Sequence, residues 1–451
     1  MRFDDFAALL RHWRERAPGK AALLYARGDA VRAMSWAELD DAVASRASAL
    51  SAGGARCVGV LCDGSVECLV EIFAAVRAGL QVALMDSNAD EALLRAQARA
   101  ADVDALWGDV DLIDEMRPAL EPSAAPLEGG MLFFTSGTTE AARAVALSQQ
   151  SLCASAWNGS ALLPLQPEDT LLCLLPMNHV FGFVCGVLWG LHCGSCVALG
   201  RGMRYYAQDC ALFRPTALSA VPLLLGFLIK HGALNPALKL ILVGAGDCPA
   251  ALLDAARLGG RRVSFGYGLT ETSSGVALSL GDDPFAMTVC PEVEPAIAPD
   301  GEILLRAPSI MMRGYYKDPA ATSAALVDGV LHTGDLGRLD DQGRLYVTGR
   351  KKEMLVLSDG TKLFLPEYEG RLAAALSGRE CAVMLINGRP VLVLHGAEDE
   401  RGAVVEQLKP VMARLPRGQQ LGGIRFTPEP LPRTASGKIK RWELQQKVGQ
   451  P

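Results

Sequence analysis

An excess of positive charge is missing from this sequence, and so is the composition of a disordered chain. The 44 Lys and Arg are outnumbered by 50 Asp and Glu, so the net charge of −6 gives no reason to expect nucleic acid as a partner. Half of the 451 residues are hydrophobic and only 21% are charged, which predicts a globular chain with a sizeable core. At this length we expect two or three domains.

Paired cysteines and a secretory leader are also missing. The 12 cysteines are scattered through apolar segments, and the first five residues have no signal-peptide character. This pattern predicts buried, reduced thiols and a cytoplasmic location. Cys193 and Cys196 have the spacing of a redox or half-zinc motif, but no second pair or histidine cluster completes it.

Charged side chains are absent from residues 171–200, a stretch long enough to span a bilayer. One proline, two histidines and five glycines interrupt it. We therefore interpret it as a strand over 171–175, a buried helix over 183–191 and a strand over 196–199, all inside a covered core. This composition leaves contact with a membrane surface open but does not predict it.

Short apolar runs alternate with helical patterns through most of the chain. Apolar strands that are each followed by a helix indicate parallel sheets covered on both faces, and two such stretches predict two sheets. Shorter strands with Gly and Pro turns between about residues 276 and 347 predict a small antiparallel β subdomain. The strands expected in the two sheets are residues 57–62, 82–85, 131–134, 171–175, 196–199, 217–220, 240–243 and 263–265.

The predicted fold is α/β, with a large domain over residues 1–350 and a small α+β domain over residues 351–451. The large domain combines the two covered, largely parallel sheets with the antiparallel subdomain. From Arg350 onward 17 Lys and Arg face 11 Asp and Glu, whereas the rest of the chain is acidic. The basic part either attracts the acidic part or serves an anionic ligand.

A run of hydroxyl side chains around one glycine follows the predicted strand 131–134: Thr135, Ser136, Gly137, Thr138 and Thr139. Such hydroxyls and the backbone N–H groups of the turn suit phosphate oxygens, although most clusters of this composition are ordinary loops. No Gly-Lys-Ser/Thr follows, so the run is not a Walker A motif.

Three later motifs also carry groups suited to a nucleotide. Residues 266–272 follow a predicted strand. They contain an aromatic ring that could stack on a base, a hydroxyl that could bind phosphate and a carboxylate that could hold a divalent ion. An ordinary Gly-rich turn into a helix is an equally open interpretation. Asp335 is a carboxylate of the kind that accepts ribose hydroxyls, and Arg350 is a donor for ribose or phosphate. Lys438 lies in a Ser-Gly-Lys motif near the C-terminus and, taken alone, is ordinary surface charge.

In this order the four motifs resemble those of the adenylate-forming superfamily, which contains acyl- and aryl-CoA synthetases, luciferases and the adenylation domains of peptide synthetases. The resemblance covers nearly the whole chain, includes residues 35–39 and 312–319, and is strongest to acyl- or aryl-CoA ligases. It implies an acid–thiol ligase that uses ATP and Mg²⁺ to convert a carboxylic acid to acyl-AMP and then transfers the acyl group to a thiol. It also implies that the small C-terminal domain is mobile.

The resemblance implies a role for each matching residue. ATP would be bound by Thr135, Ser136, Gly137, Thr138, Thr139, Arg143, Gly266, Tyr267, Gly268, Thr270, Asp335 and Arg350, with Tyr267 stacked on adenine and the last two on the ribose. Glu271 would hold Mg²⁺, and His179 would line the acyl pocket. Lys438 would bridge the carboxylate and the α-phosphate, because two anions that react need cations on both sides. Lys352 would be the hinge of the small domain.

The phosphate loop departs from the usual pattern of the superfamily. After Thr139 the superfamily has Gly-x-Pro-Lys-Gly, whereas this chain has Glu140-Ala-Ala-Arg143-Ala. Glu140 adds negative charge beside a triphosphate site, and Arg143 replaces the lysine but retains a cation that neutralises phosphate. We expect weaker or reshaped ATP contact. A homologue that binds ATP and acid with impaired catalysis is the alternative.

The sequence offers fewer residues from which to infer the acid substrate and the thiol acceptor. Members that activate amino acids place an Asp early in the acid pocket, whereas residues 177–181 contain no acidic side chain. Residues 220–229 and 276–280 offer apolar walls, so we expect an apolar fatty or aryl acid. CoA is the expected acceptor. A separate acyl carrier protein is the alternative, because it presents the same thiol and no carrier domain follows residue 451.

Overall fold

The computed structural model describes residues 1–28, 30–108, 127–135, 143–357, 362–433 and 439–448. The chain divides into two compact units. The first unit contains Met1–Thr135, Ala142–Thr333 and Arg338–Val347, and the described part of the second consists of residues 334–337 and those from Thr348 onward.

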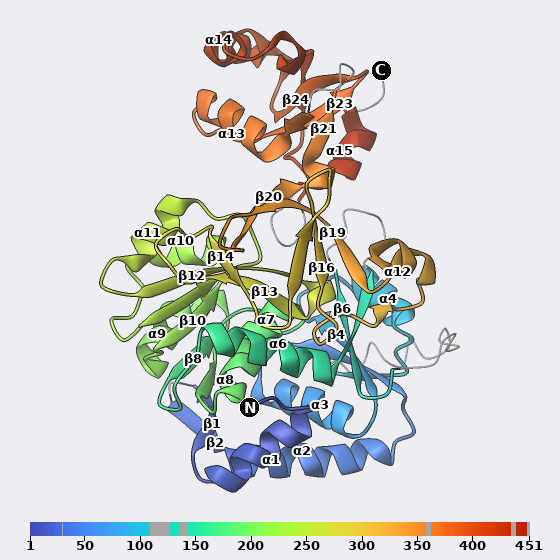
Figure 1. Ribbon diagram of the computed structural model, residues 1–451, viewed down its shortest axis with the longest axis vertical. Coiled ribbons are helices and arrows are strands. Elements are labelled where there is room, and N and C mark those ends of the chain that lie inside the picture. The colour runs from blue at the N-terminus through green and yellow to red at the C-terminus, as the bar shows by residue number, and fades with distance from the viewer. Residues whose placement is uncertain (29, 109–126, 136–142, 358–361, 434–438, 449–451) are drawn as a thin grey trace. The chain divides into compact units, whose positions relative to one another are not determined.

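The larger sheet starts parallel and ends antiparallel (Figure 1). Its parallel strands, in spatial order, are β1 (Ala21–Arg27), β9 (Cys196–Leu199), β8 (Thr170–Cys173), β10 (Ala217–Ala220), β11 (Leu240–Val243) and β12 (Arg262–Leu269). The hairpin partner of β1, β2 (Ala30–Ser35), closes this edge. The sheet confirms that residues 171–200 belong to a covered core, since β8 and β9 are inner strands.

The short antiparallel strands expected between about residues 276 and 347 are present, and they continue this same sheet. Residues 262–265 of β12 pair in parallel with β11, and residues 266–269 pair antiparallel with β13. One strand therefore joins the two halves. The continuing strands are β13 (Ser274–Ser279), β14 (Met287–Val289), β20 (Leu345–Arg350), β19 (Val330–Leu339) with β18 (Leu326–Val327), β16 (Glu302–Arg306) and β15 (Glu294–Ile297).

The second sheet confirms the other predicted parallel set. Its order is β5 (Ala105–Trp107), β3 (Cys57–Cys62), β4 (Gln81–Asp86), β6 (Gly130–Phe134), β7 (Ala144–Ser148) and β17 (Gly314–Tyr315). The first four strands are parallel, whereas β7 runs back beside β6 and β17 runs antiparallel to β7. As a result, residues 314–315 lie next to the strand that follows the hydroxyl-rich run.

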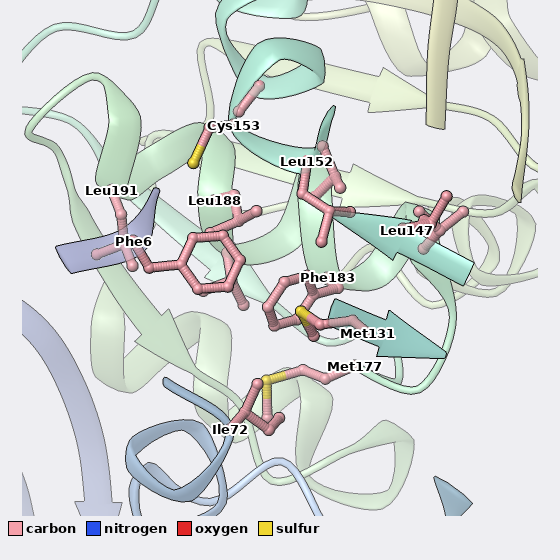
Figure 2. Packing of buried hydrophobic residues seen from close by; sticks show 14 of the residues in the cluster. Phe6, Ile72, Met131, Leu147, Leu152, Cys153, Met177, Phe183, Leu188 and Leu191 are labelled. Atoms are coloured by element: carbon pink, nitrogen blue, oxygen red, sulfur yellow. The ribbon is translucent and has the colours of Figure 1, made fainter. Parts of the chain in front are cut away.

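Helices fill the space between the two sheets and cover their outer faces. The inner helices are α1 (Phe6–Arg16), α2 (Trp36–Ser51), α3 (Val66–Arg77), α6 (Gln149–Leu162), α7 (Val180–Phe183) and α8 (Trp189–His192). α9 (Tyr206–Phe213), α10 (Pro222–Lys230) and α11 (Ala250–Arg257) pack on the larger sheet, and α4 (Glu91–Ala100) packs on the smaller one. Figure 2 shows Phe183 in the inner core among Phe6, Met131 and Leu188.

The helix expected over residues 183–191 is longer and less regular than the sequence suggested. It runs as α7, a π-helical segment over Val184–Leu188, and α8. Glycines at every fourth residue let it approach the sheet, because a Cβ atom at Gly186 would lie 3.0 Å from Cys173 Sγ and one at Gly190 would lie 2.7 Å from Val197 Cγ2. Among the residues described, no helix combines the length and the apolar character needed to cross a bilayer.

The second unit is an α+β fold with its own core. A two-stranded sheet joins β21 (Met354–Val356) to β22 (Lys362–Phe364), and a three-stranded sheet has the order β23 (Cys381–Ile386), β24 (Arg389–His395) and β25 (Gly423–Thr427). The helices are α13 (Leu365–Ala375), α14 (Arg401–Met412) and α15 (Arg441–Val448). Leu372, Val383 and Leu392 are fully buried at the centre of this core.

Buried His192 predicts a pH-dependent stability. The imidazole packs edge-on against Phe3, with ring centroids 5.3 Å apart, and burial lowers its pKa from the usual 6.5 to about 4. The unfolded chain therefore binds a proton between these pH values and the folded chain does not. The contribution of neutral His192 to the free energy of unfolding is fully present above about pH 6.5. The free energy of unfolding should fall by about 2–3 kcal/mol as the pH approaches 4.

The measurement is the urea midpoint of wild type and His192→Leu across this pH range. Carboxylates titrate in both proteins, so the difference in slope isolates the histidine. The midpoint of the wild type should fall more steeply toward acid pH. Parallel slopes would contradict a buried, neutral His192.

Candidate functional site

The two ends of the hydroxyl-rich loop are held together. Thr135 follows β6 directly, and Arg143 precedes β7. The backbone N–H of Thr135 donates to the carbonyl of Arg143 at 3.0 Å, so the antiparallel pairing of β6 and β7 extends to the base of the loop. Ser136, Gly137, Thr138 and Thr139 lie outside the described residues, as does Glu140. Thr135 and Arg143 fix where that loop begins and ends.

The second motif is part of a strand, which corrects the expectation that it follows one. Gly266, Tyr267 and Gly268 are the second half of β12, and Thr270 begins a 3₁₀ turn over Thr270–Thr272. At Gly268 the register with β13 shifts, and a Cβ atom there would lie 1.5 Å from the Ser274 carbonyl oxygen. Only glycine permits this close approach of two backbones. The strand therefore delivers Tyr267 and the following acidic turn to one edge of the sheet.

Glu271 and Arg143 meet through one tyrosine. The Tyr315 hydroxyl donates to Glu271 Oε1 at 2.7 Å, and the Arg143 guanidinium lies 5.4 Å from the centroid of the same ring. Arg143 Nε also lies 3.7 Å from Asp318 Oδ2. Burial and the charge of Glu271 raise the pKa of Tyr315, so its hydroxyl remains a donor. A cation from the loop base and a carboxylate from the 3₁₀ turn after β12 thus converge on a single side chain.

Glu271 fits the magnesium role that the resemblance implies. The Tyr315 hydroxyl donates to Oε1 of the Glu271 carboxylate. No described residue donates a hydrogen bond to the other oxygen, Oε2. Mg²⁺ prefers oxygen ligands and is commonly held by one or two carboxylates together with substrate phosphates. Among the described residues no group of three or more His, Cys, Asp or Glu forms a metal cage. A site of this composition would hold the ion only together with a phosphate ligand.

His179 lies at the start of α7, near the carboxyl ends of the parallel strands. It remains solvent-exposed, but partial loss of hydration lowers its pKa, and the charge of Asp86 opposes this effect. Two residues later, Phe181 covers the end of β11: a Cβ atom at Gly244 would lie 3.1 Å from its ring and 3.3 Å from the Gly266 carbonyl oxygen. In open α/β sheets ligands bind beyond the carboxyl ends of the strands. At the end of β11 this region presents the aromatic ring of Phe181.

The second unit brings two of the predicted nucleotide-binding residues together. Arg350 Nε lies 2.9 Å from Asp335 Oδ1, and Asp335 is buried. Lys352 is exposed in a short 3₁₀ turn over Lys351–Glu353. Lys438 lies outside the described residues, but Arg433 and Ile439 on either side of its segment form an antiparallel bridge.

Sequence reasoning missed Tyr315 and left the cysteine pair open. Tyr315 lies in the segment 312–319, which carried a family resemblance but no assigned chemistry. Only the pairing of β17 with β7 shows that its hydroxyl reaches Glu271. All 12 cysteines are free, and burial raises the pKa of Cys193 and raises that of Cys196 to about 12. These thiols are poor nucleophiles at neutral pH.

Comparison with known families gives one extended match. The sequence profile of the family described as AMP-binding enzyme matches residues 10–129 and 111–316. These ranges contain the hydroxyl-rich loop, the β12 motif, His179 and Tyr315.

Relatives and solved structures extend the match beyond these residues. An indoleacetate–CoA ligase of Aromatoleum aromaticum is 29% identical over 97% of this chain and 98% of its own length. A ligase of Mycobacterium tuberculosis that joins a dioxo-octahydroindenyl propanoyl group to CoA is 30% identical over 72% of this chain and 67% of its own. The structure of O-succinylbenzoate coenzyme A synthetase from Bacillus subtilis in complex with AMP superposes with a TM-score of 0.81 at 22% identity, covering 97% of this chain and 98% of that one.

Proposed function

We propose, from the premise that this chain belongs to the AMP-binding enzyme family, that it is an AMP-forming carboxylate–CoA ligase. It activates an apolar acid with ATP and then transfers the acyl group to the thiol of CoA. The relative that spans nearly its whole length is a CoA ligase, and the likeness to solved ligases extends through both units.

The convergence of Arg143 and Glu271 on Tyr315 is the observation that carries this proposal. Attack of a carboxylate on the α-phosphate gathers negative charge, so catalysis needs positive charge placed in advance. Arg143 supplies one cation at the base of the phosphate loop, and Glu271 is the carboxylate that would hold Mg²⁺ against the phosphates. Bound Mg²⁺ would neutralise phosphate charge. Lys438 would supply a further cation to the reacting carboxylate.

The aromatic ring of Phe181, two residues after His179, supports an uncharged aryl or fatty acid as substrate. This ring lies 3.1 Å from the place where a Cβ atom on Gly244 would be, at the end of β11. An α-ammonium group would find no carboxylate free for it in residues 177–181. The indole and indene ring systems in the names of two relatives agree with a cyclic apolar acid.

The test is ATP–pyrophosphate exchange with a panel of acids. Fatty acids of short, medium and long chain, benzoate, cinnamate and indoleacetate cover the proposed class, and glycine and phenylalanine serve as amino-acid controls. An apolar acid should stimulate exchange well above the rate without acid. If none does, the ligase proposal fails.

The acceptor is decided by comparing thioester yield with CoA, pantetheine and a phosphopantetheinylated carrier protein. We propose CoA, because the relatives named above are CoA ligases. Recognition of the CoA nucleotide should make pantetheine a much poorer acceptor. The basic C-terminal region would also attract an acidic carrier, with a rate that falls as salt screens the approach. Loading of the carrier alone would overturn the choice of CoA.

Arg143 is expected to replace the loop lysine of the superfamily. Arg143→Ala should raise the KM for ATP by about tenfold, the scale of one lost charged hydrogen bond. Arg143→Lys keeps the cation and should stay within about twofold of the wild type. Both constants come from pyrophosphate exchange at saturating acid. An unchanged KM in the alanine variant would mean that Arg143 makes no contact with the triphosphate.

A further inference from the structure

The backbone of Tyr315 is held by contacts on two sides. Its backbone pairs with Val145 of β7, and its N–H donates to Thr322 Oγ1 at 2.9 Å. Gly314 before it has a φ of +145°, and a Cβ atom there would lie 2.9 Å from Thr322 Cγ2. Only glycine is accommodated at this point. The backbone of Tyr315 is thereby clamped between a strand and a helix.

The residues after Tyr315 extend the clamp. Tyr316 donates its hydroxyl to Asp102 Oδ2 at 3.1 Å, and the ammonium of Lys317 lies 2.7 Å from Asp102 Oδ1. Asp102 is buried between α4 and β5. Adjacent tyrosines therefore point their hydroxyls at two different carboxylates, Glu271 and Asp102.

We propose that Tyr315 is a positioning residue that holds the Glu271 carboxylate in the orientation in which its second oxygen binds Mg²⁺. This inference rests on the proposed function. A carboxylate on a short 3₁₀ turn is free to rotate unless one oxygen is anchored, and ligands that are oriented by an outer hydrogen bond bind metal more tightly. Tyr315 supplies the anchor from a rigid strand pair, and the Glu271 backbone is fixed by the Met312 N–H, which donates to its carbonyl at 2.8 Å.

The test measures ATP binding by calorimetry at a series of Mg²⁺ concentrations, without acid, so that no turnover is needed. Tyr315→Phe removes only the hydroxyl and should raise the half-saturating Mg²⁺ concentration by about tenfold, the effect usual for a lost outer hydrogen bond. Tyr316→Phe is the matched control, since it loses a tyrosine–carboxylate bond of the same kind next door, and should match the wild type. AMP binding in EDTA should be equal in all three proteins.

The possible results separate the explanations. Equal Mg²⁺ dependence in Tyr315→Phe and the wild type would overturn the positioning role, and so would a parallel loss of AMP affinity, which indicates general damage to the site. Glu271→Gln tests the premise independently. If that variant also keeps the Mg²⁺ dependence of the wild type, the metal role of Glu271 fails, and the inference fails with it. A weakened Glu271→Gln beside an unaffected Tyr315→Phe rejects only the inference.

Discussion

Replacing Lys438 with alanine is expected to slow acyl-AMP formation by about 10²-fold or more, the scale of losing one group that stabilises charge in a transition state. The lysine is needed where the carboxylate attacks the α-phosphate, because both reactants are anions. In the second half-reaction the thiol attacks the acyl carbonyl and AMP leaves with the extra negative charge, so no carboxylate has to be brought against the α-phosphate. Thioester formation from supplied acyl-AMP should therefore proceed at nearly the normal rate.

The two half-reactions are measured separately, by pyrophosphate exchange and by thioester release from synthetic acyl-AMP. Lys440→Ala is the control, since it removes a cation two residues away whose ammonium lies 3.7 Å from Glu443 Oε2. It should leave both half-reactions within about twofold of the wild type. Equal damage to both half-reactions in Lys438→Ala would mean that the lysine supports the fold or the nucleotide rather than adenylation.

Lys352→Pro is expected to give the opposite pattern, with adenylation preserved and thioester formation reduced by about tenfold or more. If the small unit rotates between the half-reactions, the backbone near residue 352 must change its dihedral angles, and proline fixes φ. Lys352 lies in a three-residue 3₁₀ turn just after β20. From Thr348 onward the chain belongs to the second unit, so this turn is close to the boundary between the units in the sequence.

Lys352→Ala separates the backbone from the side chain. The ammonium is exposed, so its removal should change neither half-reaction if the hinge depends on the backbone alone. Both variants should unfold at urea midpoints close to the wild type. If Lys352→Pro lowers adenylation as strongly as thioester formation, rotation about this point is the wrong mechanism for this protein.

Much of the fold was predictable because it follows from local patterns. Uniformly apolar runs such as residues 57–62 and 240–243 became inner parallel strands, since only a strand covered on both faces lacks polar positions. The start of α2 was marked by Ser35 and Glu38, which form a capping box. The enzyme class predicted from the ordered motifs is confirmed by the family match over residues 10–316. The individual site residues stay predictions.

Other features were hidden because they depend on pairing between distant segments. β1 joins the larger sheet beside β9, more than 160 residues later in the chain, and no local signal in its apolar sequence names that partner. Its hairpin partner β2 lacks the apolar run that marks an inner strand. The division of β12 between a parallel and an antiparallel partner also leaves no local signal, since both halves are extended backbone.

By itself the sequence determined the alternating α/β architecture, the order of the motifs and the chemical groups available for a nucleotide and an acid, because propensity, apolar periodicity and motif spacing are local properties. Only the tertiary structure decided that Glu271 shares Tyr315 with Arg143, since residues 143, 271 and 315 meet through the pairing of β17 with β7 and a single 2.7 Å hydrogen bond. A hydrogen bond between residues 44 positions apart depends on distance and angle in space, and no spacing along the chain encodes those.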